Sequence, residues 1–232
     1  EVSLVDLLGR DEVSLDEDSI RDFIHGKRVL ITGAGGSIGS ELVRQCLKYE
    51  PAVLVMLDLS EYNLFEIDRE IMSLNSTVLF KPVLCDIRDK DVLNQVFDEF
   101  EPQVVLHAAA YKHVPMQETF PWEAVKTNVL GTTNLTEVAL KHMVEKFVLV
   151  STDKAVKPVN VMGATKRLAE LIVQSANSSS TEFMAVRFGN VLGSSGSVIP
   201  IFQEQIRNGG PVTVTDPDMQ RYFMSVSEAS QL

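Results

Sequence analysis

Residues 29–40 read VLITGAGGSIGS, and this stretch decides the fold. An apolar run typical of a buried strand ends in glycines, and a helix pattern follows at once. Gly33, Gly36 and Gly39 form the spacing G-x-x-G-x-x-G. In a dinucleotide-binding turn, the first glycine permits the tight bend, the second lets backbone approach a pyrophosphate, and the third lets helix pack on strand.

The residues on either side of the glycines fit a strand–helix–strand unit. Residues 27–32 predict the first strand, apolar residues at helical spacing predict a helix over 38–47, and residues 52–57 predict the second strand. The helix begins at Ser37 and Ile38, where unpaired N–H groups can bind phosphate oxygens. Asp58 ends the second strand, where a carboxylate can bind the adenosine ribose and repel a 2′-phosphate. We therefore expect NAD rather than NADP.

Length and composition set limits on the class of protein. The chain has 232 residues and a net charge of −11 without a basic cluster, so we expect no nucleic-acid partner. Cys46 and Cys85 are expected to be buried thiols rather than a disulfide. No apolar run reaches the roughly 20 residues that span a bilayer, and no signal peptide is visible. The chain starts at Glu1 and stops within a helix pattern, which predicts a soluble fragment of a longer protein.

Strand and helix patterns alternate along the rest of the chain. This alternation predicts an α/β fold of Rossmann type, a doubly wound parallel sheet with ligands at the carboxyl edge of the strands. We expect an N-terminal linker on the domain edge over 1–26, the nucleotide-binding domain over 27–190, and the start of a substrate-binding part over 191–232. The further strands are predicted over 78–84, 103–107, 147–150 and 183–188, and the further helices over 64–71, 89–100, 122–142 and 163–176.

Two groups of residues follow the later strands. Ala108, Ala109 and Ala110 come directly after a strand, and their small side chains leave room for a ligand. The residues Thr152, Asp153 and Lys154 come after the next strand, and Lys166 lies on the helix that follows. A hydroxyl, a carboxylate and amines can supply a hydrogen bond, an acid and a base to one ligand. The alternatives are a solvated turn with an Asp–Lys pair and an exposed helix lysine.

Five blocks of sequence carry a family resemblance. They are TGAGGSIGSE at 32–41, HAAAYKHVP at 107–115, STDKAVKPVNVMGATK at 151–166, RFGNVLGSSGSVIP at 187–200 and PDMQRYFMS at 217–225. Together they resemble the extended short-chain dehydrogenase/reductase superfamily. More narrowly, they are similar to the large, membrane-anchored UDP-N-acetylglucosamine 4,6-dehydratases of polysaccharide biosynthesis. The resemblance implies that a tightly held NAD(P)⁺ oxidises C4 of the sugar, that water leaves across C5 and C6, and that the hydride returns to C6.

The resemblance also implies roles by position. Thr152 and Lys166 would polarise the 4-hydroxyl, Lys154 would take the C5 proton, and Asp153 would protonate the departing 6-hydroxyl. Met162 stands where the superfamily has the tyrosine of Tyr-x-x-x-Lys, and a thioether cannot give up a proton. The large members of the family resemble this chain in that methionine. The base at C4 is therefore left open, with Asp153 and Lys154 as further candidates.

The remaining blocks imply binding roles. Asp86 and Ile87 would face adenine or cap a strand, and Lys112 and His113 would lie near the sugar or in a plain surface loop. Asn190 and Arg221 would hold the nucleotide and diphosphate of a UDP-sugar, since guanidinium suits a diphosphate. The histidines share no ligand spacing, so we expect no metal site.

Two other functions stay open at this point. A nucleotide-sugar 4-epimerase shares the fold, cofactor and substrate class but usually needs the tyrosine that Met162 replaces. A non-catalytic dinucleotide-binding module is the third reading. The resemblance places the longer protein at the cytoplasmic face of a bacterial inner membrane and is compatible with a homo-oligomer.

Overall fold

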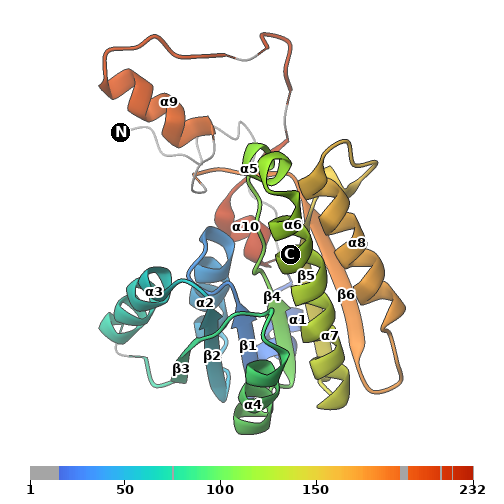
Figure 1. The fold of residues 1–232 in the computed structure, drawn as a ribbon. Helices are drawn as coiled ribbons and strands as arrows, with labels where there is room; N and C mark the ends of the chain where they lie inside the picture. The colour runs from blue at the N-terminus through green and yellow to red at the C-terminus, as the bar shows by residue number, and fades with distance from the viewer. Residues whose placement is uncertain (1–15, 75, 194–197, 215, 221, 232) are drawn as a thin grey trace.

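A parallel sheet forms the centre of the molecule (Figure 1). The computed structural model describes residues 16–74, 76–193, 198–214, 216–220 and 222–231. The second and third strands of the chain lie on one side of the first strand, and the fourth to sixth strands lie on its other side. Where the strand order reverses in this way, a crevice opens at the carboxyl edge of the sheet. In spatial order the six strands are β3 (Leu79–Leu84), β2 (Val53–Asp58), β1 (Arg28–Thr32), β4 (Val104–His107), β5 (Lys146–Thr152) and β6 (Glu182–Phe188).

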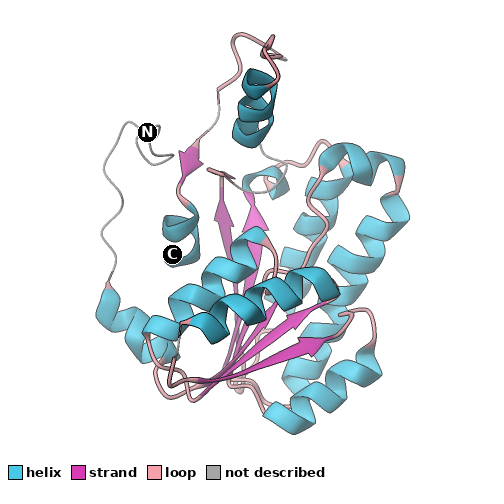
Figure 2. Cartoon of the chain, turned by 90° about the vertical axis from the view of Figure 1, so that its left-hand side faces the viewer, coloured by secondary structure: helices cyan, strands magenta, loops and turns pink. Residues whose placement is uncertain are grey.

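Helices cover both faces of the sheet, as Figures 1 and 2 show. Successive residues of a strand point to opposite faces. Val29 and Ile31 of β1 therefore pack in one core with the first group of helices, whereas Leu30 packs in the other core with the second group. The first group is α1 (Glu17–Ile24), α2 (Ser37–Lys48) and α3 (Glu61–Ser73), and the second is α4 (Lys90–Phe100), α7 (Thr132–Lys141) and α8 (Val161–Ser175).

The predicted Rossmann-type fold is confirmed, and three local features differ from the sequence expectation. Helix α1 occupies part of the segment expected to be a linker, and Ile24 anchors it in the core. A short helix, α5 (Val114–Thr119), follows the loop after β4. The long helical stretch expected over 122–142 is divided into α6 (Pro121–Ala124), the π-helix η2 (Val125–Gly131) and α7. Periodicity alone does not distinguish an α-helix from a single π-turn within it.

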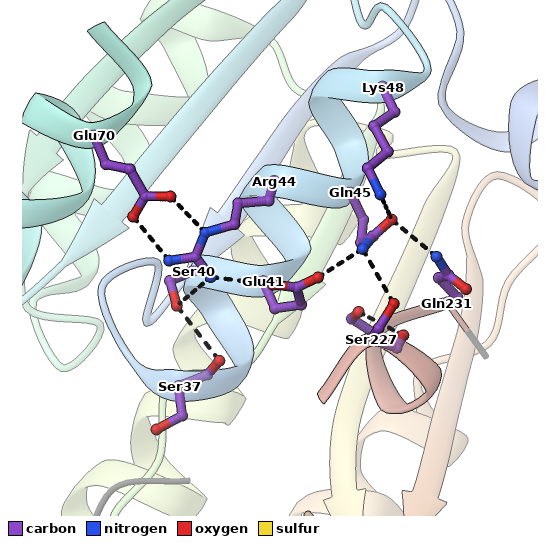
Figure 3. Close-up of polar contacts among 10 residues, drawn as sticks. Ser37, Ser40, Glu41, Arg44, Gln45, Lys48, Glu70, Ser227 and Gln231 are labelled. Atoms are coloured by element: carbon purple, nitrogen blue, oxygen red, sulfur yellow. Dashed lines mark hydrogen bonds and ion pairs between the residues drawn. The ribbon is translucent and has the colours of Figure 1, made fainter. Parts of the chain in front are cut away.

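Polar contacts tie α2 to two neighbouring helices (Figure 3). Arg44 donates two hydrogen bonds to the Glu70 carboxylate of α3, at 2.6 and 2.8 Å, and these hydrogen bonds lower the pKa of Glu70. Gln45 joins α2 to the C-terminal helix α10 (Val226–Gln231): its amide oxygen accepts from Gln231 at 2.9 Å, and its Nε2 donates to Ser227 at 3.4 Å. The helix that starts at the glycine turn is thus held at its far end.

Two short strands and one helix near the C-terminus lie beyond the carboxyl edge of the main sheet (Figures 1 and 2). Strands β7 (Asn190–Val191) and β8 (Phe223–Met224) form a parallel pair, and α9 (Val198–Arg207) has no buried residue. Arg221 lies outside the described residues, so its role stays a prediction. None of the helices in the described part of the chain is long and apolar enough to cross a membrane.

Candidate active site

The glycine turn between β1 and α2 leaves no room for side chains. Gly33 has φ +67°, a conformation that favours glycine. A Cβ added there would lie 2.7 Å from the backbone nitrogen of Ala109, and one added to Gly39 would lie 1.9 Å from the Gly33 carbonyl oxygen. Gly36 is the N-cap of α2 and has no capping side chain. The start of α2 is therefore a backbone cradle that side chains at positions 33 and 39 would disrupt.

A cavity of about 370 Å³, called here the first cavity, opens beside this turn. Its walls are the glycine turn and the carboxyl ends of β2, β3 and β4, with one residue each from α3 and η2. Most residues predicted to bind a cofactor line it, whereas Ser37, Ile38, Gly39 and Lys166 do not. The lining residues are Gly33, Gly36, Leu57, Asp58, Leu59, Ser60, Asn63, Cys85, Asp86, Ile87, Ala108, Ala109, Ala110, Tyr111 and Thr127.

Two carboxylates in the first cavity are held by neighbouring donors. Asp58 accepts the N–H groups of Gly35 at 2.9 Å and Ser60 at 2.8 Å, which orients the carboxylate beside the glycine turn. Asp86 accepts the Arg88 backbone N–H at 2.9 Å and its Nε at 2.7 Å. Burial opposes the charge of Asp86, but the hydrogen bonds from Arg88 outweigh it and lower the pKa of the carboxyl. Both groups can accept hydrogen bonds from a ligand's hydroxyl or amine groups.

The end of β5 carries a connected set of polar side chains. Lys154 donates from Nζ to Asp153 at 3.1 Å and to the Asn190 amide oxygen at 3.2 Å. Thr152 donates to Asp153 at 3.0 Å. Burial opposes the charge of Asp153, but the hydrogen bonds from Lys154 and Thr152 lower the pKa of its carboxyl. The structure therefore brings together three of the predicted catalytic residues and one predicted substrate-binding residue.

Lys166 lies one helical turn after Met162 in α8, and both side chains are buried. The Lys166 Nζ donates to the Val150 carbonyl at 2.8 Å, at the end of β5. Burial lowers the pKa of Lys166 to about 8, although the nearby charge of Glu170 opposes that shift. The alternative of an exposed helix lysine is therefore wrong. An amine with such a pKa can exchange a proton near neutral pH.

Glu170 is a buried carboxylate that sequence reasoning missed. It accepts hydrogen bonds from Ser151 of β5 at 2.6 Å, from Arg187 of β6 at 2.6 and 2.7 Å, and from Arg167 at 2.9 Å. Burial opposes its charge, but the hydrogen bonds from Arg187, Ser151 and Arg167 lower the pKa of Glu170 to about 2. This network holds α8, and with it Lys166, against the ends of two strands. The spacing of Lys166 and Glu170 on one helix face was the only signal in the sequence.

His107 is a second buried group that sequence reasoning missed. Thr132 donates its hydroxyl proton to the Asn128 carbonyl, so it accepts from His107 Nε2 at 3.0 Å. The other ring nitrogen, Nδ1, then accepts from Thr32 at 2.7 Å. Burial, with a smaller effect of the Lys166 charge, lowers the pKa of His107 to about 3. A neutral histidine thus links β1, β4 and α7 beneath the site.

A second cavity, of about 240 Å³, lies beside the β5 cluster. Ile38, Lys112 and Asn190 line it, and burial lowers the pKa of Lys112. His113 does not line it and is the N-cap of α5. The lining residues are Ile38, Lys112, Phe188, Gly189, Asn190, Val191, Val198 and Phe223.

Other parts of the described chain offer less chemistry. A further cavity, between α1, α2, α10 and the face of β4 to β6, has no charged lining residue. Cys46 and Cys85 are buried and unpaired, as expected, and burial raises the pKa of Cys46 to about 12. Among the described residues, no three His, Cys, Asp or Glu side chains are grouped so that they could hold a metal ion.

The chain is similar to proteins of surface-polysaccharide synthesis. A family model described as "Polysaccharide biosynthesis protein" matches residues 29–232. The Staphylococcus aureus capsular polysaccharide biosynthesis protein CapD is 52% identical over 234 aligned positions, which cover 100% of this chain and 39% of CapD. The Campylobacter jejuni UDP-N-acetylglucosamine 4,6-dehydratase (inverting) is 35% identical over 210 positions, which cover 88% of this chain and 61% of that enzyme. The chain thus spans less than two thirds of both relatives.

Solved structures share the fold. Pen from Bacillus thuringiensis is 40% identical with a TM-score of 0.84, and the match covers 90% of this chain and 64% of Pen. The Thermus thermophilus UDP-glucose 4-epimerase, solved in complex with NAD, is 26% identical with a TM-score of 0.72. That match covers 88% of this chain and 72% of the epimerase.

Proposed function

We propose that this chain, which belongs to the polysaccharide biosynthesis protein family, is the catalytic part of an NAD-dependent nucleotide-sugar 4,6-dehydratase acting on UDP-N-acetylglucosamine. The observation that carries the proposal is the contact of Lys154 with both Asp153 and Asn190, at 3.1 and 3.2 Å. It joins an acid–base pair to the second cavity. Met162, buried one turn before Lys166, offers no phenol for the chemistry of an epimerase.

The first cavity fits a dinucleotide. The glycine cradle would offer backbone N–H groups to a pyrophosphate, and Asp58 would offer a carboxylate to ribose hydroxyls. The small side chains of Ala108 to Ala110 leave room for the ligand. NAD is the cofactor of the epimerase structure that shares this fold. A bound NAD would supply the chemistry for removing a hydride from C4 of the sugar and for returning it at C6.

Lys154 and Asp153 are a suitable pair for the elimination of water. In the ligand-free protein Lys154 and Asp153 form an ion pair, in which the hydrogen bonds from Lys154 and Thr152 outweigh burial and lower the pKa of the Asp153 carboxyl. Closing a sugar over the pair removes water and favours its neutral form, in which the proton has moved to Asp153. Neutral Lys154 can then take the C5 proton while Asp153 protonates the departing 6-hydroxyl, so that water leaves and the charges balance. The protonated Lys154 returns a proton to C5 when the hydride is returned at C6.

Thr152 and Lys166 serve the 4-hydroxyl in this proposal. Both lie at the end of β5, where Lys166 is held by the Val150 carbonyl and Thr152 by Asp153. The lowered pKa of Lys166, about 8, suits a group that receives the 4-hydroxyl proton as the ketone forms and then passes it to solvent. Lys154 and Asp153 remain candidates for the base at C4.

The second cavity would take the UDP-sugar. Asn190 and Lys112 line it, and an amine and an amide suit the diphosphate and sugar of that ligand. Ile87 and Asp86 would face adenine at the other end of the site. The product would serve surface-polysaccharide synthesis, as the name of CapD says of that protein. We further propose that the full-length protein is anchored at the cytoplasmic face of the inner membrane.

One experiment separates a dehydratase from an epimerase. The full-length protein is incubated with UDP-N-acetylglucosamine deuterated at C4, and the product is analysed by NMR. A dehydratase gives a 4-keto-6-deoxy sugar with deuterium in its new methyl group. Deuterium recovered at C4 of a galacto-configured product would instead identify an epimerase, and unchanged substrate would indicate a binding module.

A further inference from the structure

We propose that Thr127 is a further cofactor-binding residue, whose hydroxyl hydrogen-bonds the ADP half of a bound dinucleotide. The inference rests on the dinucleotide binding proposed above. Thr127 lines the first cavity, only 8% of its surface is exposed, and its Oγ1 has no hydrogen-bond partner. A buried hydroxyl without a partner costs free energy, so the fold keeps it at a cost that a ligand would offset.

Neighbouring threonines show that the helix here does not prevent a threonine hydroxyl from finding a hydrogen-bond partner. A helical threonine commonly donates to the carbonyl one turn back. Thr132 does so to Asn128 at 2.7 Å, and Thr133 does so to Val129 at 2.9 Å. Thr127 lies in the π-helix η2 and makes no such bond.

Asn128, the residue after Thr127 in η2, makes the structural hydrogen bonds that Thr127 does not make. Asn128 accepts the Tyr111 N–H at 2.8 Å, and its amide donates to the Tyr111 carbonyl at 3.0 Å and to Thr165 of α8 at 3.1 Å. Asn128 therefore clamps the loop after β4 to α8. Consecutive helical residues point in different directions, so the side chain of Thr127 is left for the cavity.

The position within the cavity indicates which half of the cofactor Thr127 meets. Gly131 lies one turn later, where an added Cβ would be 2.7 Å from the Ile87 Cδ1, so η2 passes directly against Ile87. The cavity also holds Asp58 and Asp86 but neither Thr152 nor Lys166. Thr127 thus lies with the residues proposed for adenosine and pyrophosphate, away from those proposed for the nicotinamide end.

The test compares Thr127→Val with Thr136→Val. Thr136 is also buried with an unpartnered Oγ1 but lines neither the first nor the second cavity, which makes it a matched control. Calorimetry measures the binding of NAD⁺ and of ADP, and thermal unfolding without ligand measures stability. We expect Thr127→Val to bind both ligands roughly 3- to 10-fold more weakly, as for loss of one neutral hydrogen bond. Both variants should unfold no earlier than the parent.

Each other outcome overturns a specific claim. Parental binding by Thr127→Val refutes the inference, and weaker NAD⁺ binding with unchanged ADP binding refutes the assignment to the ADP half. If the valine variant fails to fold, Thr127→Ser must bind NAD⁺ as the parent does and Thr127→Ala must bind it more weakly. If the parent chain binds neither ligand, the proposed function itself fails, and the inference fails with it.

Discussion

The two sides of the proposed site differ in the groups that shape them. On the side of β1 to β3, the first cavity is shaped by backbone: Gly33 and Gly39 leave no space for a Cβ. On the side of β5 and β6, the site is shaped by charged side chains, with Lys166 and Glu170 buried and Lys154 in contact with Asp153. In the proposed function the first side offers a rigid form to a cofactor, and the second offers protons to a substrate.

The difference determines how each side should respond to mutation. A shape made by backbone is sensitive to added atoms, because its contacts are already at van der Waals distance. A charged network is sensitive to removed groups, because a buried charge without its partner is costly. The predictions below use changes of both kinds.

The largest effect is expected on the charged side. Lys154→Met should lower the turnover of the full-length enzyme by about 10²- to 10⁴-fold, because it removes the group proposed to take the C5 proton. NAD⁺ binding should stay nearly unchanged, since Lys154 contacts Asp153 and Asn190 and does not line the first cavity. Turnover and calorimetry measure the two quantities.

Lys157→Met, at an exposed lysine three residues further along the chain, is the control for this change. It should keep parental turnover. Activity of Lys154→Met within a few-fold of the parent would show that another group takes the C5 proton.

On the backbone side, one added methyl group should have the next largest effect. The Cβ of Gly39→Ala would lie 1.9 Å from the Gly33 carbonyl oxygen, so β1 and α2 must move apart. We expect a loss of about 3 kcal/mol in the free energy of unfolding, measured in urea. Gly36→Ala is the control, because its Cβ would lie 3.2 Å from the same oxygen.

The Gly36→Ala variant should lose dinucleotide affinity, since Gly36 lines the first cavity, while its stability changes by less than about 1 kcal/mol. Equal stability of the two alanine variants would contradict the tight packing of strand and helix.

The same contrast explains what the sequence could predict. The glycine spacing and the alternation of strands and helices determine backbone geometry locally, so the sheet and most of the first cavity were predictable from them. Glu170 and His107 are different, because their partners come from distant strands: Arg187 and Ser151 for Glu170, and Thr32 for His107. Such networks exist only after the chain has folded, and single residues at helical or strand spacing do not reveal them. The π-helix at η2 was hidden because the spacing of apolar residues does not distinguish one π-turn from an α-helix.

His107 links the two sides and should give the protein a pH-dependent stability. Its pKa is about 3 in the folded protein, below the unfolded value of 6.5. The unfolded chain therefore takes up a proton first, and stability falls as the pH falls below 6.5. Between pH 7.5 and pH 5 the loss should reach about 2 kcal/mol.

Urea unfolding across this pH range measures the slope. His107→Gln keeps one donor and one acceptor and should be less stable than the parent at pH 7.5, but with a much flatter pH dependence. An unchanged slope in this variant would assign the effect to other groups.

Asp58 is the exception on the backbone side, since it acts there through a charge. Its carboxylate lines the first cavity and is oriented by the N–H groups of Gly35 and Ser60. A 2′-phosphate near it would meet like charge, so NAD⁺ should bind about tenfold more tightly than NADP⁺.

Asp58→Asn should narrow the ratio of the two dissociation constants. The ratio is the quantity to measure by calorimetry, because asparagine offers one oxygen to two N–H donors and lowers the affinity for both cofactors. Glu61→Gln, at an exposed carboxylate in the first turn of α3, removes the same formal charge outside the cavity and should leave the ratio unchanged. Tighter binding of NADP⁺ by the parent would mean that charge does not select the cofactor on this side, and that the backbone cradle alone determines its affinity.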